Sequence, residues 1–181
     1  IDKLFLERLG DIAEYGYYNI GLTIAGFVAT FFLAVYQSFE PDLYKMIAQK
    51  RHKDYKKYVA VYIGVMVFLT IAFIMVSHPI VYYLTSGRYA YAATYANVFV
   101  IGVFFMQVGG IYEQLFTAYS ATKLVMWRNI VMGTFCIIAY YWMIEYFQFK
   151  GANITRVLTG LFYIASGTIL WLYYKKKHIK K

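Results

Sequence analysis

One carboxylic acid interrupts an otherwise uncharged run of residues from 93 to 119. This residue, Glu113, lies at the edge of a helical face on which polar or small residues recur. The face consists of Gln107, Gly110, Gln114 and Thr117. An ionisable group within an apolar helix is costly in lipid and usually faces protein or water. Two interpretations of Glu113 stay open, a role in transport and a position at the membrane interface, and Gln107 and Gln114 are candidates for lining a polar cavity.

A second polar stripe follows one face of the uncharged run 16–39. Its members recur every three or four residues and are Asn19, Thr23, Gly26, Thr30, Ala34 and Gln37. Small residues at this spacing let helices pack closely in a membrane. The same stripe can instead line a polar cavity, because amides stand at both of its ends. Both interpretations remain open from the sequence.

Arg128 directly precedes the run 129–147, whose one charged residue is Glu145. As a positive charge at a helix end it is a topology signal, and as a guanidinium it can bind a phosphate that enters from the inner leaflet. Metal and cofactor chemistry have no such candidates, because the three histidines are scattered and Cys136 is alone. Phosphate-binding loops and zinc motifs of soluble enzymes are also missing, so the sequence predicts no enzyme, no metal and no cofactor.

The elements that must position these residues are membrane-spanning helices. The chain is 61% hydrophobic and 15% charged, whereas soluble domains are about 45–50% apolar and 25% charged. Five runs are uncharged or nearly so, and they cover residues 16–39, 58–77, 93–119, 129–147 and 154–174. About 20 apolar residues cross a hydrocarbon core of roughly 30 Å. The fold class predicted is therefore all-α, a polytopic membrane helix bundle of about five spans.

Basic residues divide unevenly between the two faces that alternating spans create. The segment 37–58, the connection 118–128 and the C-terminal tail hold thirteen Lys and Arg residues, and the other face holds five. The positive-inside rule then makes the basic loop 40–57 and the C-terminus cytoplasmic. The net charge of +9 is thus a topology signal, not a sign of nucleic-acid binding. Pro41 and Pro79 are expected just outside spans, where a proline costs a helix little.

Several short motifs stand in an order and spacing that match a known family of membrane proteins. They are Asp2-Lys3, Gly16-Tyr17-Tyr18, Pro41, the Gly87/Tyr89/Ala92 pattern, Thr122-Lys123 and Gly151-Ala152. With these motifs the whole chain resembles the C-terminal half of the polysaccharide biosynthesis membrane proteins. These are the O-antigen and capsule oligosaccharide flippases of the multidrug/oligosaccharidyl-lipid/polysaccharide exporter superfamily. The match departs at Lys3, where the family often has Arg, and in the abbreviated Gly87 pattern.

The resemblance implies a transporter lobe, helices eight to twelve of twelve, in the bacterial inner membrane. The partners it implies are a lipid-linked oligosaccharide, membrane lipids and an N-terminal half of the same protein. The cargo would be oligosaccharide on undecaprenyl pyrophosphate, moved from the cytoplasmic to the outer leaflet by alternating access. Coupling would use a proton or sodium gradient, with Glu113 as the candidate acid for ion coupling, and the polar residues on the first and third spans would line this half of the cavity.

Three other functions compete with this one. A drug or small-cation exporter of the same superfamily would place acids deep in its cavity. A membrane assembly subunit that transports nothing would use its polar stripes for dry packing. A membrane glycosyltransferase or polymerase would carry catalytic groups in its outer loops, but the outer segments 78–92 and 148–156 are short and hold no acid.

Overall fold

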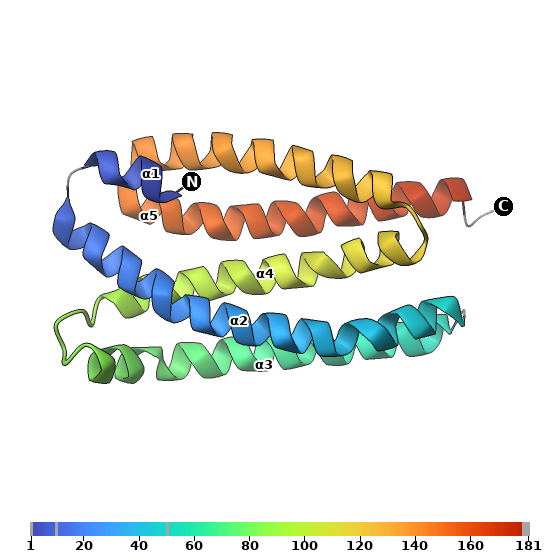
Figure 1. Cartoon of the computed structure of the whole chain (residues 1–181), viewed down its shortest axis with the longest axis horizontal. Helices are drawn as coiled ribbons and strands as arrows, with labels where there is room; N and C mark the ends of the chain where they lie inside the picture. The colour runs from blue at the N-terminus through green and yellow to red at the C-terminus, as the bar shows by residue number, and fades with distance from the viewer. Residues whose placement is uncertain (1, 10, 50, 179–181) are drawn as a thin grey trace.

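A computed structural model describes residues 2–9, 11–49 and 51–178 of the chain, and every regular element in these ranges is a helix. The long helices are α2 (Ile12–Ala48), α3 (His52–Leu84), α4 (Ala92–Ala118) and α5 (Thr122–His178). A short helix α1 (Asp2–Leu6) and a 3-10 turn η1 (Glu7–Leu9) precede them. The helices lie side by side along one axis, as Figure 1 shows. The predicted all-α bundle is therefore confirmed.

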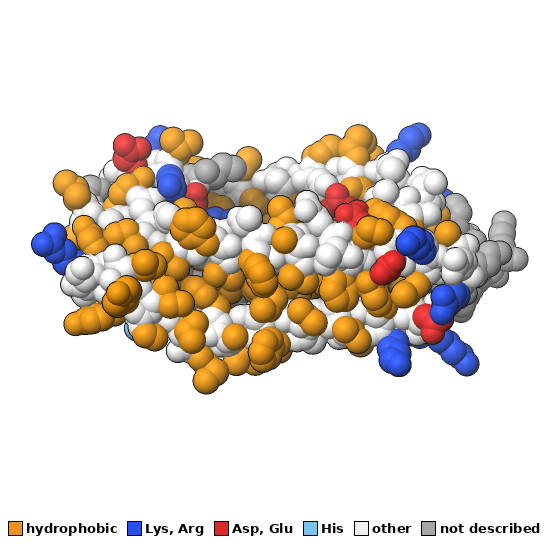
Figure 2. All heavy atoms as spheres, turned by 60° about the horizontal axis from the view of Figure 1, so that its bottom comes forward, with side chains coloured by type: hydrophobic (Ala, Val, Ile, Leu, Met, Phe, Trp, Pro, Cys, Tyr) orange, Lys and Arg blue, Asp and Glu red, His pale blue; other side chains and the backbone are white. Residues whose placement is uncertain are grey.

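The surface of this bundle is that of a multi-pass membrane protein. Within the described residues, four helices are long and apolar enough to cross a membrane. Large apolar side chains lie open on the outside, with Phe27 74% and Phe68 69% exposed. Figure 2 shows apolar side chains across the middle of the visible face and charged ones mostly toward its two ends. This distribution is typical of a helix bundle whose outer apolar faces contact lipid.

The two last predicted spans, 129–147 and 154–174, form two separate helical arms within the segment labelled α5. α5 consists of two helical arms that meet at Gln148, the residue with non-helical dihedral angles (φ 52°, ψ −133°). The arms lie side by side and run in opposite directions (Figure 1). Gly151 is required beside this bend, because a Cβ there would collide with the carbonyl oxygen of Met143. The predicted outer connection 148–156 is thus helical except for its first residue.

The predicted basic loop 40–57 is also mostly helical, which corrects the expectation of a loop. α2 continues through Pro41 to Ala48, and α3 begins again at His52. The extension is amphipathic, with Leu43 and Ile47 buried against the bundle, so packing outweighs the hydrogen bond lost at the proline. Pro79 likewise lies inside α3, so both prolines are inside helices.

α4 is the central helix of the bundle and packs against α5, α2 and α3. It has the most buried apolar segment of the four long helices. Small residues such as Ala92, Ala96 and Gly102 on α4 are fully or nearly fully buried. They allow the neighbouring backbones to approach closely, as is usual for helices packed in membranes. The side chains of α4 are therefore the ones best placed to join the other helices at a site.

The two ends of the bundle differ in charge. The α2–α3 turn, the α4–α5 turn and the C-terminal end of α5 lie at one end, which we call the basic end (Figure 1). Lysines at this end include Lys45, Lys53, Lys56, Lys123 and Lys175. The opposite end carries α1, residues 85–91 and the bend at Gln148 (Figure 1).

Candidate functional site

Arg128 lies inside the bundle, not at a solvated helix end, and only 3% of its side chain is exposed. Its Nη2 donates to the carbonyl oxygens of Gly109 at 3.0 Å and Tyr163 at 2.6 Å. Its Nε donates to the hydroxyl of Ser166 at 3.4 Å. The guanidinium also lies over the Tyr163 ring, 3.6 Å from the ring centroid. Arg128 therefore ties α4 to both arms of α5.

The close approach of α4 and the second arm of α5 depends on Gly109. A Cβ at this position would lie 2.5 Å from Cδ1 of Tyr163, which is closer than real contacts allow. Without a side chain, the α4 backbone can place the Gly109 carbonyl within reach of Arg128. The glycines at 109 and 110 therefore each allow a neighbouring aromatic ring to pack against α4, Tyr163 at Gly109 and Tyr36 at Gly110.

Glu113 belongs to the same group of residues. The hydroxyl of Tyr163 donates to Oε2 of Glu113 at 2.6 Å, so one tyrosine contacts the predicted ion-coupling acid through its hydroxyl and Arg128 through its ring. Among the described residues, no carboxylate lies within 4.0 Å of an Arg128 nitrogen. We call Glu113, Tyr163 and Arg128 the buried triad.

The buried triad contains a cation, Arg128, that has no carboxylate within 4.0 Å among the described residues. It also contains an acid, Glu113, that accepts a hydrogen bond from Tyr163. Nη1 of Arg128 is buried and has no hydrogen-bond partner among the described residues. A buried guanidinium with a spare donor is suited to an anion with several oxygens, such as a phosphate. A hydrogen bond to an ionised carboxylate is about twice as strong as a neutral one. A proton taken up by Glu113 would therefore weaken its bond to Tyr163 and loosen the ring under Arg128.

The other predicted residues of α4 do not share one open face. Gln114 is only 3% exposed, and both polar atoms of its amide lack a hydrogen-bond partner among the described residues. Gln107 is partly buried, whereas Thr117 is exposed. Leaving a buried amide unpaired costs about 1–3 kcal/mol.

The polar stripe on α2 lies open. Thr23, Thr30, Ala34 and Gln37 are exposed, and Asn19 and Gly26 are partly buried. The threonine hydroxyls donate within their own helix, Thr23 to the Asn19 carbonyl at 2.8 Å and Thr30 to the Gly26 carbonyl at 3.0 Å. A Cβ at Gly26 would meet no heavy atom within 4 Å. The stripe therefore does not serve close packing within this chain, which leaves its polar face available to water or a partner.

A pocket of about 360 Å³ at the basic end was not predicted from the sequence. It lies between the ends of the long helices, and its polar and aromatic lining consists of Tyr55, Lys56, Tyr119, Trp171 and Lys175. Aromatic faces can stack on sugar rings, and the two ammonium groups attract anions. These aromatic residues resemble an interfacial belt in the sequence, and only the fold brings them together from α3, α4 and α5.

A second polar cluster fastens α1 at the opposite end. Asp2 accepts a hydrogen bond from the Tyr18 hydroxyl at 2.7 Å and pairs with Nη2 of Arg156 at 3.3 Å. The Arg156 guanidinium lies 4.2 Å from the centroid of the Phe99 ring. Burial opposes ionisation of Asp2, but the Tyr18 hydrogen bond and the Arg156 charge together bring its pKa below the ordinary value. Arg156, predicted as an outer-face charge, is therefore partly buried and structural.

Comparison of the chain with protein-family models, with curated proteins and with solved structures gives no match in any of the three.

Proposed function

We propose that this chain is the C-terminal lobe of a membrane transporter for undecaprenyl-pyrophosphate-linked oligosaccharide. In this proposal the lobe works by alternating access with an N-terminal lobe and moves the headgroup from the cytoplasmic to the outer leaflet. The membrane would be the bacterial cytoplasmic membrane, with the basic end and the C-terminus on its inner side. The motif order of the sequence supports this function, and so do four long apolar helices.

The observation that carries the proposal is the state of Arg128. It is 3% exposed, hydrogen-bonded to two carbonyls and a hydroxyl, and has no carboxylate within 4.0 Å among the described residues. A buried charge without a counter-ion is costly, and in membrane helices it usually marks a substrate or ion path. A pyrophosphate supplies the missing negative charge and enough oxygens for a bidentate contact.

Glu113 would couple transport to a proton or sodium gradient. It accepts from Tyr163 at 2.6 Å, and the Tyr163 ring and carbonyl both contact Arg128. Binding of a proton or sodium ion at Glu113 would change the hold of Tyr163 on its carboxylate and hence the position of the guanidinium. Anion affinity at Arg128 and ion affinity at Glu113 are then linked, and each ligand changes the affinity for the other.

The pocket at the basic end would receive the headgroup first. Lys56 of α3 and Lys175 of α5 both line it, together with Tyr119 and Trp171. Phosphates would be attracted by the ammonium groups, and sugars would stack on the aromatic rings. On α4, Leu115 lines this pocket two residues after Glu113, about 3 Å further along the helix axis and on another side of the helix.

Transport of a labelled lipid-linked oligosaccharide across reconstituted vesicles tests this function. Vesicles that contain the full-length protein should expose labelled headgroup to an outside glycosidase, faster when a proton or sodium gradient is imposed. Arg128→Gln should reduce the rate to that of empty vesicles. If the unchanged protein exposes no more headgroup than empty vesicles do, the proposed function is wrong.

One observation favours a second candidate function, a membrane assembly subunit. The α2 stripe is open along its length, with Thr23, Thr30 and Gln37 exposed, and such a face can dock a partner helix. This candidate predicts that the stripe is dry in the assembled protein. A drug or small-cation exporter would need Glu113 but not Arg128, so loss of transport in Arg128→Gln argues against it.

A further inference from the structure

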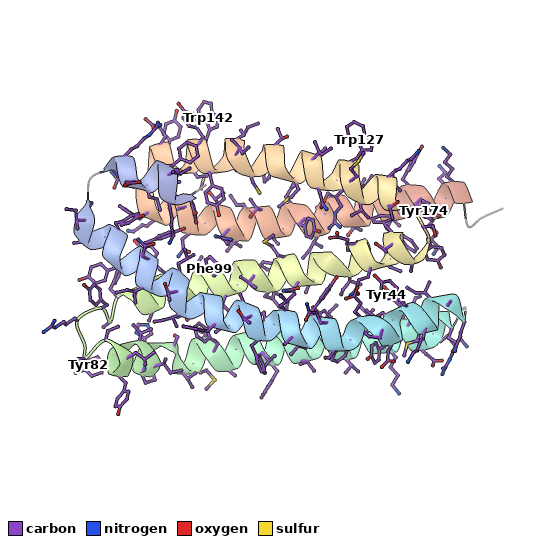
Figure 3. The ribbon with its side chains drawn as sticks, viewed as in Figure 1. Tyr44, Tyr82, Phe99, Trp127, Trp142 and Tyr174 are labelled. Atoms are coloured by element: carbon purple, nitrogen blue, oxygen red, sulfur yellow. The ribbon has the colours of Figure 1, made fainter. Side chains whose placement is uncertain are left out.

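The two arms of α5 enclose a groove that is separate from the pocket at the basic end. Its apolar part is about 310 Å³ in volume and is lined by Trp127 and Val131 on the first arm. Phe162, Ala165, Ile169 and Leu170 line it on the second arm. Trp127 is 60% exposed and Ile169 66% exposed, so the groove opens to the outside of the bundle. Figure 3 shows Trp127 projecting outward from the first arm.

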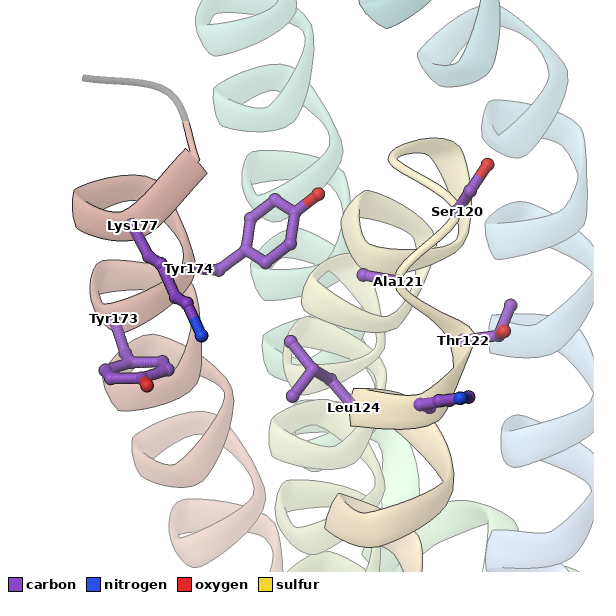
Figure 4. Close-up of a pocket in the computed structure, with 8 residues that line it drawn as sticks. Ser120, Ala121, Thr122, Leu124, Tyr173, Tyr174 and Lys177 are labelled. Atoms are coloured by element: carbon purple, nitrogen blue, oxygen red, sulfur yellow. The ribbon is translucent and has the colours of Figure 1, made fainter. Parts of the chain in front are cut away.

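A polar pocket of about 330 Å³ lies at the end of the same two arms. Figure 4 shows it between the α4–α5 turn, with Ser120 and Thr122, and the end of α5, with Tyr173 and Lys177. Lys123 also lines it. On the second arm, positions 162, 166, 169, 173 and 177 recur every three or four residues, so both pockets lie along one helix face. On the first arm, the lining positions 124, 127, 128 and 131 also lie on one helix face.

The charge along this groove has one sign. Between Glu113 and the C-terminus the chain contains a single acid, Glu145, and this residue lies near the bend at the opposite end. Lys123 and Lys177 stand at the polar pocket, and Arg128 lines the apolar groove about one turn deeper. No acid among the lining residues neutralises these cations. An occupant must therefore be negative at the basic end and apolar beyond it.

We propose that the α5 groove binds an anionic phospholipid of the leaflet at the basic end. The phosphate and headgroup lie at Lys123 and Lys177, and one acyl chain lies between Trp127 and Ile169. Along α5, Lys177 and Ile169 are eight residues apart, or about 12 Å, which leads from the headgroup region into the hydrocarbon. A lysine near an anionic membrane surface contributes about 1 kcal/mol. The groove shares Arg128 with the proposed transport function, but its headgroup lies at Lys123 and Lys177, and its test measures lipid binding without transport.

Fluorescence quenching by brominated lipids tests the site directly. In the Trp142→Phe/Trp171→Phe chain, Trp127 remains as the single tryptophan and reports on the groove. In phosphatidylcholine vesicles, brominated phosphatidylglycerol should bind next to Trp127 at least about fivefold more tightly than brominated phosphatidylcholine. Lys123→Gln/Lys177→Gln should bring this ratio close to one. Ala165→Phe, which fills the groove without changing its charge, should reduce quenching by both lipids.

A matched control separates a site from general attraction to the basic end. Lys53→Gln/Lys57→Gln removes the same charge from exposed positions on α3 and should leave the selectivity unchanged. Equal quenching by both lipids in the starting chain overturns the proposal, and so does equal loss of selectivity in the control. Protection of Trp127 from both lipids together with a cross-linked dimer also overturns it, because a second copy then fills the groove. Native mass spectrometry of the unsubstituted chain should independently show retained phosphatidylglycerol.

Discussion

The guanidinium of Arg128 lies 3.6 Å from the centroid of the Tyr163 ring, on the facing arm of the same helix. The same tyrosine donates a hydrogen bond from its hydroxyl to Oε2 of Glu113 at 2.6 Å, so the contact links a buried cation to an acid. A cation over an aromatic face gains about 0.5–2 kcal/mol, which is less than the cost of burying a charge without a counter-ion. The fold thus holds Arg128 with three hydrogen bonds and one ring contact but, among the described residues, places no carboxylate within 4.0 Å of its nitrogens, and this arrangement gives the first prediction.

Arg128→Met should leave the free energy of unfolding unchanged within about 1 kcal/mol, or raise it, while transport falls at least about tenfold. The reason is that an apolar side chain of similar length removes the desolvation cost of an unpaired charge. Unfolding in mixed detergent micelles measures the free energy of unfolding, and transport in vesicles measures the transport rate. A loss of about 3 kcal/mol or more would instead show that Arg128 serves chiefly to hold the helices together.

Glu113→Gln should retain the fold but remove the dependence of transport on the ion gradient. The amide oxygen of glutamine can still accept from the Tyr163 hydroxyl, but it binds neither a proton nor a cation near neutral pH. Transport rates with and without an imposed gradient should therefore become equal. A Glu113→Gln protein that keeps the full response to the gradient would exclude Glu113 as the coupling acid.

At the bend in α5, introducing a glycine and removing one should change the free energy of unfolding in opposite directions. Gln148→Gly should raise the free energy of unfolding by about 1 kcal/mol, because φ 52° with ψ −133° is a conformation that favours glycine. Gly151→Ala should lower it by about 2 kcal/mol or more, because the added Cβ meets the Met143 carbonyl. Gly133→Ala, on the first arm in open space, is the control and should raise the free energy of unfolding by about 0.5–1 kcal/mol, as Gly→Ala does in an exposed helix. The opposite order of effects would contradict the described bend.

Asp2 should hold α1 in a pH-dependent manner. Its pKa in the folded protein lies below the ordinary value of 3.8, so the stabilisation is present above that value. It is lost as the pH falls through the folded-state pKa. Asp2→Asn should cost about 1–2 kcal/mol near neutral pH and should remove this acid-dependent part. Proteolysis of the α1–α2 connection at several pH values measures it, and equal cleavage of both proteins throughout would refute the role of the Asp2–Arg156 pair.

The α2 stripe should be wet if it lines a transport cavity. Cysteines placed at Thr23 and Gln37 in the full-length protein should react with a water-soluble maleimide, whereas one at Phe68, an exposed apolar position on α3, should not. Substrate should slow labelling at the stripe. Equal lack of reaction at all three positions would favour the assembly subunit, in which the stripe is a dry interface.

The sequence was sufficient to predict where the long helices lie, but not at which residues they begin and end. Long uncharged runs predict spans because lipid leaves the backbone no other partner. Charge alone, however, does not show where a helix stops, and α2 continues past Pro41 because Leu43 and Ile47 pack on the bundle. The bend at Gln148 was equally hidden, since its tightness depends on a contact between Gly151 and Met143.

The candidate site could be predicted only in part. Glu113 and Arg128 stand out as charges next to apolar runs, and both belong to the buried triad. Tyr163 was missed, because one tyrosine among 21 carries no distinguishing pattern until the fold places it between them. Gly109 was the available signal, since it marks where a large side chain from another helix must fit.

The most direct measurement of the central claim is made in the native bacterium with the full-length protein. The protein is depleted, and undecaprenyl-linked oligosaccharide is quantified on each leaflet of the cytoplasmic membrane. We predict accumulation on the cytoplasmic leaflet, which wild-type protein reverses and an Arg128→Gln/Glu113→Gln protein does not. Unchanged leaflet distribution with intact surface polysaccharide would contradict the assignment of a lipid-linked oligosaccharide as the cargo.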